Sequence, residues 1–306
     1  MQALGKLLRL SLAPSVIADV AAGLVFASGG RWPSGAGPLW LMASSACVYH
    51  GALAINDWHD REHDARTRPS RPIPRGEVQP ETALAIGASL LVIGPLLALL
   101  HSHEAAFWSF GLASLALIYD LIGRGPWIGP VLLALCRSGN LGLGLLFANG
   151  AFGTSVALPV ALLPMAIYAV YVLRISQLGR MEDGEEELQL GRPAGLVLSA
   201  ALMLALLPFL PPFSSAGHAL GARFASAALA LPAAITLARP ALTRRLGTRQ
   251  QIETAMGLAL RRLSIFGAAL AALAWHPPAF DAAIVAAAIL AGYAVSARLR
   301  VVFPPS

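Results

Sequence analysis

Three aspartates recur at short spacing in one polar stretch of the chain. Asp57, Asp60 and Asp64 are spaced i, i+3 and i+7, so a helix through this stretch would place all three carboxylates on one face. Like charges at this spacing repel one another, and a hard cation that prefers oxygen ligands would relieve that repulsion. Magnesium fits, because it usually takes one or two carboxylates together with substrate phosphates. The alternative interpretation is an acidic helix end exposed to water.

Basic residues follow these aspartates at once. Residues 66–76 hold Arg66, Arg68, Arg71 and Arg75, interleaved with prolines. The planar guanidinium group suits phosphate oxygens, which it can bind through two parallel hydrogen bonds. Carboxylates for a metal beside arginines for phosphate therefore predict a diphosphate site. Membrane topology alone would explain the number of arginines, but not their position directly after the aspartates.

The elements that position these residues are hydrophobic helices. Of the 306 residues, 57% are hydrophobic and 12% are charged, whereas soluble domains carry about 25% charged residues. Crossing a bilayer takes roughly 20 apolar residues in a helix, and lipid leaves no water for unpaired backbone groups. We therefore predict an all-α, polytopic membrane helix bundle that forms a single domain over residues 1–306. The ten predicted spans are 11–30, 37–56, 82–101, 103–122, 127–149, 155–178, 193–211, 217–238, 251–275 and 279–298.

The basic residues predict how the bundle is oriented. Of the 22 lysines and arginines, all except Arg31 and Arg223 are on the side of the membrane that holds the N-terminus, the even-numbered joints and the C-terminus. Because cytoplasmic joints carry an excess of positive charge, we expect both termini and both acidic stretches in the cytoplasm. The net charge of +6 then reflects topology and not nucleic-acid binding. We expect an integral protein of a lipid bilayer, in a bacterial inner (plasma) membrane.

The first polar stretch resembles a known motif. Asn56-Asp57-x-x-Asp60-x-x-x-Asp64, followed by Arg-Thr-Arg-Pro-x-Arg-Pro-Ile-Pro-x-Gly, is similar to the first aspartate-rich motif of the UbiA superfamily of intramembrane prenyltransferases. The resemblance implies a core of nine helices, to which the tenth, C-terminal helix would be an addition. It also implies Mg²⁺ held by two aspartate-rich motifs, a prenyl diphosphate as donor, and transfer of the prenyl group to a lipophilic or aromatic acceptor.

The resemblance assigns roles in the first motif and in a second signature. Asn56, Asp57, Asp60 and Asp64 would form the first metal site, and Arg68 and Arg71 would contact phosphate. After the fourth helix the family has a Tyr-Pro-x-x-Lys-Arg element. Tyr119 and Arg124 match it, whereas Asp120 and Gly123 stand in place of the proline and the lysine.

Helix 5 carries a polar pair that could replace the missing lysine. Arg137 and Asn140 lie one turn apart, and an arginine within a membrane helix usually faces the bundle interior or a wet cavity. The alternative is that Arg137 reaches to the cytoplasmic head groups. Asp19, within the first helix, is either part of a polar cavity or a structural hydrogen-bond partner. Asp19, Asp120 and His59 are the candidates for a general base.

The second aspartate-rich motif of the family would fall at residues 177–187. Arg180 and Asp183 match it, but Gly179 stands where the leading aspartate belongs. Glu182 or Glu186 would supply the missing oxygen beside Asp183. The departures and the extra helix are similar to a divergent bacterial branch, the Ebo-cluster members. This leaves open a catalytically impaired protein that binds or helps to export an isoprenoid or lipophilic metabolite.

Overall fold

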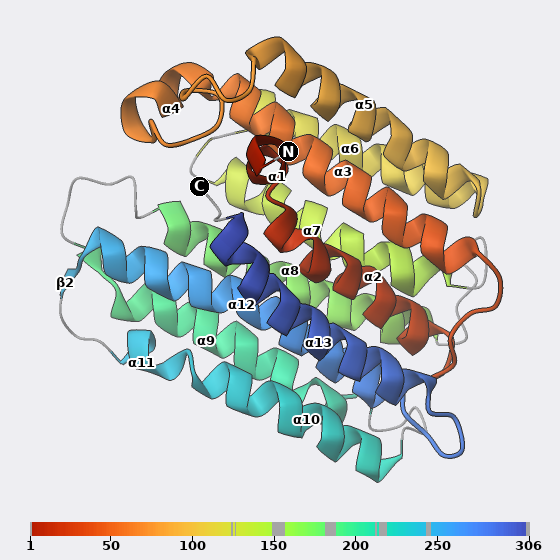
Figure 1. Cartoon of the computed structure of the whole chain (residues 1–306). Helices are drawn as coiled ribbons and strands as arrows, with labels where there is room; N and C mark the ends of the chain where they lie inside the picture. The colour runs from red at the N-terminus through yellow and green to blue at the C-terminus, as the bar shows by residue number, and fades with distance from the viewer. Residues whose placement is uncertain are drawn as a thin grey trace.

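The computed structural model is a bundle of long helices that run alongside one another (Figure 1). The structure describes residues 2–123, 125, 127–148, 157–180, 188–211, 213, 219–242 and 246–303. Ten long helices overlap the ten predicted spans: α2 (Ala13–Ala27), α3 (Gly37–His59), α5 (Pro80–Leu99), α6 (His103–Leu121), α7 (Ile128–Phe147), α8 (Leu158–Arg180), α9 (Gly191–Leu206), α10 (Leu220–Ile235), α12 (Arg249–Leu273) and α13 (Asp281–Val302). The predicted helical fold class is confirmed.

Short elements join the long helices. They are α1 (Gln2–Leu7), α4 (Arg61–Thr67), α11 (Ala238–Ala241), the 3₁₀ turns Leu10–Leu12 and Leu207–Phe209, and the two-residue strands β1 (Leu188–Gln189) and β2 (Leu246–Gly247). The two strands pair antiparallel and bring the start of α9 beside the start of α12. The C-terminal end of α13 lies at the same end of the bundle as α1 and α4 (Figure 1).

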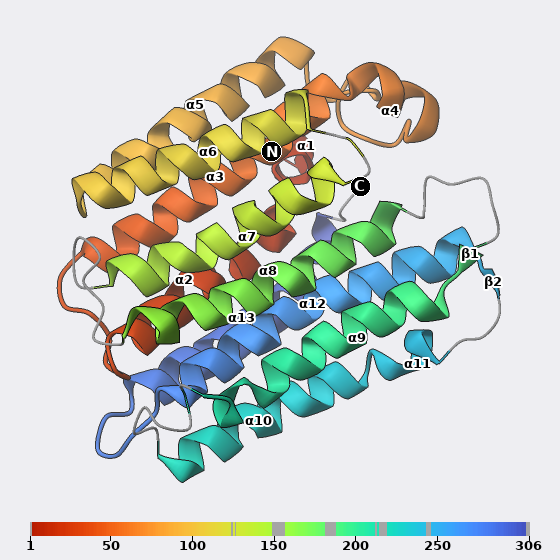
Figure 2. The same ribbon diagram turned by 180° about the vertical axis from the view of Figure 1, so that it is seen from behind.

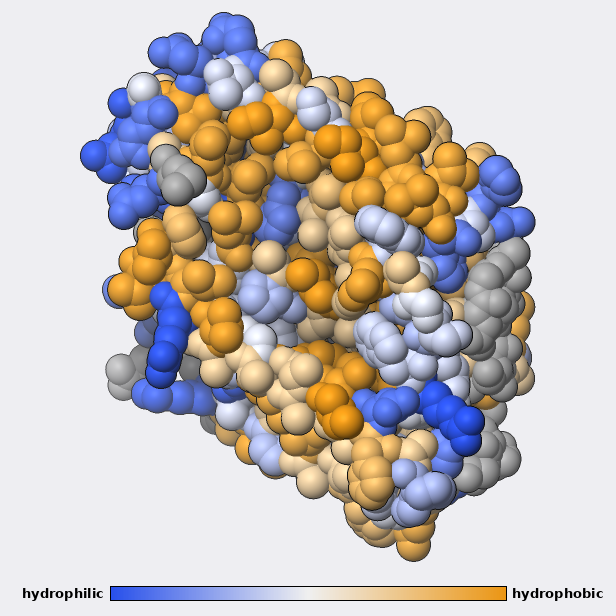
Figure 3. All heavy atoms as spheres, turned by 45° about the vertical axis from the view of Figure 1, so that its right-hand side comes forward, coloured by the Kyte–Doolittle hydropathy of each residue, from blue (hydrophilic) through white to orange (hydrophobic). Residues whose placement is uncertain are grey.

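Among the described residues, eight helical segments are long and apolar enough to cross a membrane. They are Leu10–Ala27, Gly37–His59, Pro80–Leu99, Ile128–Phe147, Leu158–Arg180, Gly191–Phe209, Arg249–Leu273 and Asp281–Val302. Large apolar side chains such as Phe107 and Ile122 are about four-fifths exposed. Figure 3 shows hydrophobic residues over the middle of one face of the molecule. Such a surface is stable against lipid and not against water, so the chain is an integral membrane protein.

Helix α2 is central to the bundle. It packs against α3, α7, α12 and α13, while α7, α8 and α9 follow one another on the other side (Figure 2). Glycines permit the close approach of α2 to α7. A Cβ atom on Gly23 would lie 2.8 Å from the Leu141 carbonyl oxygen, and one on Gly144 would collide with the Val20 carbonyl. Small residues at such crossings let two backbones touch, which brings the polar side chains of α2 and α7 together.

A second, smaller core fixes the end of the bundle that carries the first motif. Leu7 of α1 packs with Ile73, Val78 and Ala83, all of them buried. This apolar contact fastens the N-terminal segment and the arginine-rich loop to α3 and α5. It therefore determines where the basic residues of that loop can reach.

Candidate active site

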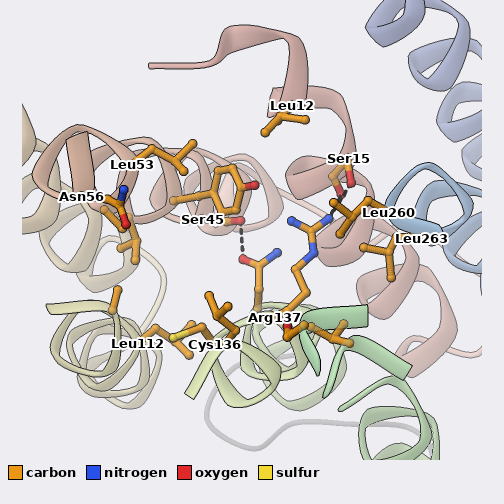
Figure 4. A pocket seen from close by; sticks show the side chains of 18 of the residues that line it. Leu12, Ser15, Ser45, Leu53, Asn56, Leu112, Cys136, Arg137, Leu260 and Leu263 are labelled. Atoms are coloured by element: carbon orange, nitrogen blue, oxygen red, sulfur yellow. Dashed lines mark hydrogen bonds between the residues drawn. The ribbon is translucent and has the colours of Figure 1, made fainter. Parts of the chain in front are cut away.

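A cavity of about 260 Å³ lies inside the bundle. Its walls come from α2, α3, α6, α7, α8, α12 and α13 and are largely apolar, with Leu53, Leu112, Leu260 and Leu263 around it (Figure 4). Polar side chains enter from several helices, Asn56 from α3 among them. An apolar interior with a few convergent polar groups is the usual form of a site for a small ligand.

The first motif does not follow one continuous helix, so the expectation of a single carboxylate face on such a helix is wrong. Helix α3 ends at His59 and α4 begins at Arg61, because Asp60 turns the chain with a ψ of 0°. The Asn56 side-chain amide donates to Asp60 Oδ2 at 3.3 Å. Asn56 lines the cavity, so the two residues form the part of the motif nearest to it.

Asp57 and Asp64 are buried and joined by one arginine. Arg71 Nη1 donates to Asp57 Oδ1 at 3.2 Å and to Asp64 Oδ2 at 2.5 Å. Arg9 Nη2 also donates to Asp57 Oδ1, at 2.8 Å. Arg9 has a φ of 48°, a left-handed conformation that is uncommon outside glycine, so its position is fixed by its surroundings. Pairing is what makes burial of these charges tolerable.

The donor atoms of this motif fit magnesium as a partial coordination shell. The second oxygens, Asp57 Oδ2 and Asp64 Oδ1, are buried and accept no hydrogen bond from the described residues. Within the part of the chain that the structure describes, no three His, Cys, Asp or Glu side chains are grouped closely enough to hold a metal alone. Magnesium does not need three, because it binds through one or two carboxylates plus phosphates and water. Asp183, Glu182 and Glu186 of the second motif lie outside the described residues.

Of the other predicted phosphate contacts, some line the cavity and some do not. Tyr119 lines the cavity from the end of α6, next to the buried Asp120. Arg180 Nη1 donates to the Gly125 carbonyl oxygen at 2.6 Å, which ties the end of α8 to the joint between α6 and α7. Arg68 ends α4 and, like Arg180, is not part of the cavity wall. Arg124 lies outside the described residues.

Arg137 and Asn140 both line the cavity from α7 (Figure 4). Arg137 Nε lies 2.9 Å from Asp19 Oδ2, and Arg137 Nη2 donates to Ser15 Oγ at 2.5 Å. The guanidinium therefore pairs inside the bundle and does not reach out to head groups. It also lies over the ring of Tyr49, 5.5 Å from the centroid, in a cation–π contact.

Asp19 is the centre of this polar network. Tyr168 donates its hydroxyl to Asp19 Oδ1 at 2.7 Å, and the Asn140 amide donates to Asp19 Oδ2 at 3.3 Å. Ser45 in turn donates to Asn140 Oδ1 at 2.5 Å. Of the two alternatives for Asp19, the structure shows the structural one: Asp19 does not line this cavity, but it is the acceptor that orients two side chains of the cavity wall.

Several cavity residues escaped the sequence analysis. Helices α12 and α13 contribute Arg261, Tyr293, Ser296 and Arg300 to the wall. The arginines had been explained by topology, as charges of cytoplasmic helix ends. Arg261 lies well inside α12, twelve positions after its first residue, and that depth was the signal for a role inside the bundle.

The comparison that decides the family covers most of the chain. The UbiA prenyltransferase family matches residues 16–265. The chain belongs to this family. The resemblance inferred from the aspartate-rich motif is therefore confirmed. Helix α13 follows the matched residues, as an added helix would.

Named relatives of the family match over shorter stretches. A digeranylgeranylglyceryl phosphate synthase from Natronomonas pharaonis is 33% identical over 123 residues, which is 40% of this chain and 43% of that protein. A 4-hydroxybenzoate octaprenyltransferase from Pseudomonas putida is 30% identical over 117 residues, 38% of each chain. The matched stretches span less than half the length of these curated relatives.

Solved structures share the fold. A UbiA homolog from Aeropyrum pernix K1 superposes with a TM-score of 0.61 at 17% identity, over 86% of this chain and 97% of that one. A UbiA homolog from Archaeoglobus fulgidus, bound to GPP and Mg²⁺, superposes with a TM-score of 0.55 at 14% identity, over 88% and 99%. At these identities the likeness establishes the arrangement of helices.

Proposed function

We propose that this member of the family transfers a prenyl group from an allylic prenyl diphosphate to a lipophilic or aromatic acceptor within the membrane, in a Mg²⁺-dependent reaction. The observation that carries the proposal is the apolar cavity with Asn56 of the aspartate-rich motif in its wall. Two structures of the Archaeoglobus fulgidus homolog support it, because they are bound to GPP and Mg²⁺ and to DMAPP and Mg²⁺.

The aspartate-rich motifs would hold the ion and the diphosphate. Asn56, Asp57, Asp60 and Asp64 form the first site, and Asp183 with Glu182 or Glu186 forms the second. The bound ion supplies Lewis-acid stabilisation of the departing diphosphate charge. Arg71 keeps Asp57 and Asp64 oriented through its bonds to both carboxylates. Arg68, Arg124 and Arg180 are the proposed diphosphate contacts.

The cavity would hold the prenyl chain and the reacting carbon. When the C–O bond breaks, its electron pair leaves with diphosphate and the allyl group carries the positive charge. The rings of Tyr49 and Tyr119 line the cavity, and aromatic faces stabilise such a cation. The acceptor then forms the new bond with its own electron pair and loses a proton, for which Asp120 is the carboxylate in the cavity wall. Arg137 and Asn140 border the same space.

The proposed location follows from the charges. Both termini and both acidic motifs would face the cytoplasm, and the bilayer would be a bacterial inner membrane. The substrate diphosphate then stays on the aqueous side while its tail enters the apolar cavity.

A second candidate function is binding or export of an isoprenoid metabolite without turnover. It rests on the two positions at which this chain departs from the family pattern. A Cβ atom on Gly179 would lie 2.5 Å from Met256 Sδ, and one on Gly123 would collide with Leu132. Neighbouring side chains thus occupy the space that an aspartate and a lysine would use.

Diphosphate release separates the two functions. Purified protein in lipid would receive geranyl, farnesyl or geranylgeranyl diphosphate with a set of aromatic and lipid acceptors, in Mg²⁺ or in a chelator. The proposal requires Mg²⁺-dependent release that Asp60→Asn impairs and that Glu253→Gln, a matched change at an exposed carboxylate of α12, retains in full. Absence of release from every donor would favour the binding protein.

A further inference from the structure

Two arginines of the cavity belong to no motif of the family. Arg261 of α12 and Arg300 of α13 both line the same cavity as Asn56 and Arg137. Helix α13 lies beyond residues 16–265, the part of the chain that the family matches.

Helix α13 turns one face to the cavity. Tyr293, Ser296 and Arg300 are spaced i, i+3 and i+7, which places them in one row along the helix, and all three line the cavity. The helix packs against α2 and α12 (Figure 1). Ser296 donates to the Ser11 carbonyl oxygen at 2.5 Å, and Arg262 donates to the Tyr293 hydroxyl at 3.3 Å. These bonds fix the rotation of α13 and with it the direction of Arg300.

No described residue compensates the charge of the two guanidinium groups. Neither Arg261 nor Arg300 forms an ion pair or a hydrogen bond with any described residue, and Arg300 Nε is buried without a partner. The two groups lie within electrostatic range of each other and repel. Arg137, by contrast, is neutralised by Asp19. Unpaired cations inside a membrane protein are costly, and they commonly mark the place where an anionic ligand binds.

The arginine pair and the aspartate-rich motif lie on different helices. Arg261 belongs to α12 and Arg300 to α13, whereas Asn56 is near the end of α3 and Asp60 follows that helix. A diphosphate held at Asn56 and Asp60 would carry its own metal ligands there. The pair Arg261 and Arg300 is consequently available to a second anion.

We infer that Arg261 and Arg300 bind the anionic head group of an amphiphilic second substrate, a phosphate monoester or a carboxylate, whose apolar body lies in the cavity. That this ligand is the prenyl acceptor rests on the proposed function. The anion site itself does not, because it follows from the unpaired charges and the apolar wall.

Binding of dodecyl phosphate tests the site without requiring turnover. Titration calorimetry in a neutral maltoside detergent would compare the unaltered protein with Arg261→Gln, Arg300→Gln and Arg298→Gln. Arg298 is the matched control, since it is exposed on α13 and does not line the cavity. Each cavity variant should weaken binding about tenfold, as expected for loss of a charge-assisted hydrogen bond. Arg298→Gln should leave the affinity unchanged, and all variants should elute as folded protein.

Three further probes decide what the site recognises. Dodecanoate should bind in the same arginine-dependent way, dodecanol should not bind, and inorganic phosphate should bind more weakly than dodecyl phosphate. Unchanged affinity in both cavity variants would overturn the inference. Equal affinities for inorganic phosphate and dodecyl phosphate would also overturn it. So would variants that lose affinity only for farnesyl diphosphate with Mg²⁺, because the arginines would then bind the donor. Failure of diphosphate release would refute the proposed function and leave the dodecyl phosphate result standing.

Discussion

Asp19 of α2 and Arg137 of α7 form a buried ion pair, 2.9 Å apart, beside the cavity. The Asp19 carboxylate is 1% exposed, and its other contacts come from Tyr168 and Asn140. One carboxylate thus orients an arginine and an amide that face the ligand space. The pair has no sequence motif, because its members are 118 positions apart and meet only through the close α2–α7 crossing.

Breaking this pair should destabilise the bundle. Asp19→Asn leaves the Arg137 guanidinium buried without its counter-charge, which costs about 3–5 kcal/mol. The double variant Asp19→Asn with Arg137→Gln should lose less than the sum of the two single losses, because no isolated charge remains. Unfolding in mixed micelles titrated with dodecyl sulfate measures the free energies. Additive losses would show that the two side chains act independently.

The two arginines that bind Asp57 should contribute unequally to the stability of the protein. Arg71→Ala removes bonds to both Asp57 and Asp64 and should cost about 3 kcal/mol or more, since two carboxylates stay buried. Arg9→Ala removes one bond and should cost about 1–3 kcal/mol. Lys6→Ala serves as the control, because its contact with Glu77 is long, at 3.9 Å, and both side chains are partly exposed to solvent. Equal losses in all three would contradict a central position for Arg71.

The Mg²⁺ concentration needed for activity should depend on Asp60, the aspartate of the first motif that contacts the cavity residue Asn56. Asp60→Asn keeps the size of the side chain and its contact distance to Asn56 but removes a charge. The Mg²⁺ concentration for half-maximal diphosphate release should rise by at least about tenfold, as expected for loss of a coordinating carboxylate. A Mg²⁺ titration of release measures this shift, with Glu253→Gln as control. An unshifted midpoint would remove Asp60 from the proposed metal ligands.

The α2–α7 crossing should tolerate no added carbon. Gly144→Ala places a methyl group against the Val20 carbonyl and should destabilise the protein by about 1–3 kcal/mol. Gly111→Ala in α6 is the matched control, because nothing lies within 4 Å of its would-be Cβ atom. Because alanine has a higher helix propensity than glycine, Gly111→Ala should leave the stability unchanged or raise it slightly. Both are measured by unfolding in mixed micelles, and similar effects at the two sites would argue against a tight crossing.

The sequence allowed the ten long helices to be predicted because lipid imposes their length and composition directly. Asn56, Tyr119, Arg137 and Asn140 were predicted from the sequence to belong to the site, and the structure brings these four to one cavity. Their residue types are rare enough in apolar helices to draw attention individually.

Long-range pairing could not be predicted in the same way. No local sequence pattern indicates that Arg9 and Arg71 form ion pairs with Asp57. Nor does one indicate that the chain turns at Asp60 and interrupts the helix. The positive charge expected at cytoplasmic helix ends already accounts for Arg261 and Arg300, so the sequence alone does not indicate that they point into the cavity. Only the packing of α13 on α2 and α12 shows that they face inward.

Helix α13 also has a consequence for how the protein is made. The Ser11 carbonyl oxygen, close to the start of the chain, receives its hydrogen bond from Ser296. During synthesis this N-terminal segment can pair Arg9 with Asp57 early, yet its partner on α13 leaves the ribosome some 285 residues later. The cavity therefore stays open on one side until α13 has inserted. A nascent chain that stops at residue 275 would carry the aspartate-rich motifs but would lack the part of the cavity wall that α13 contributes.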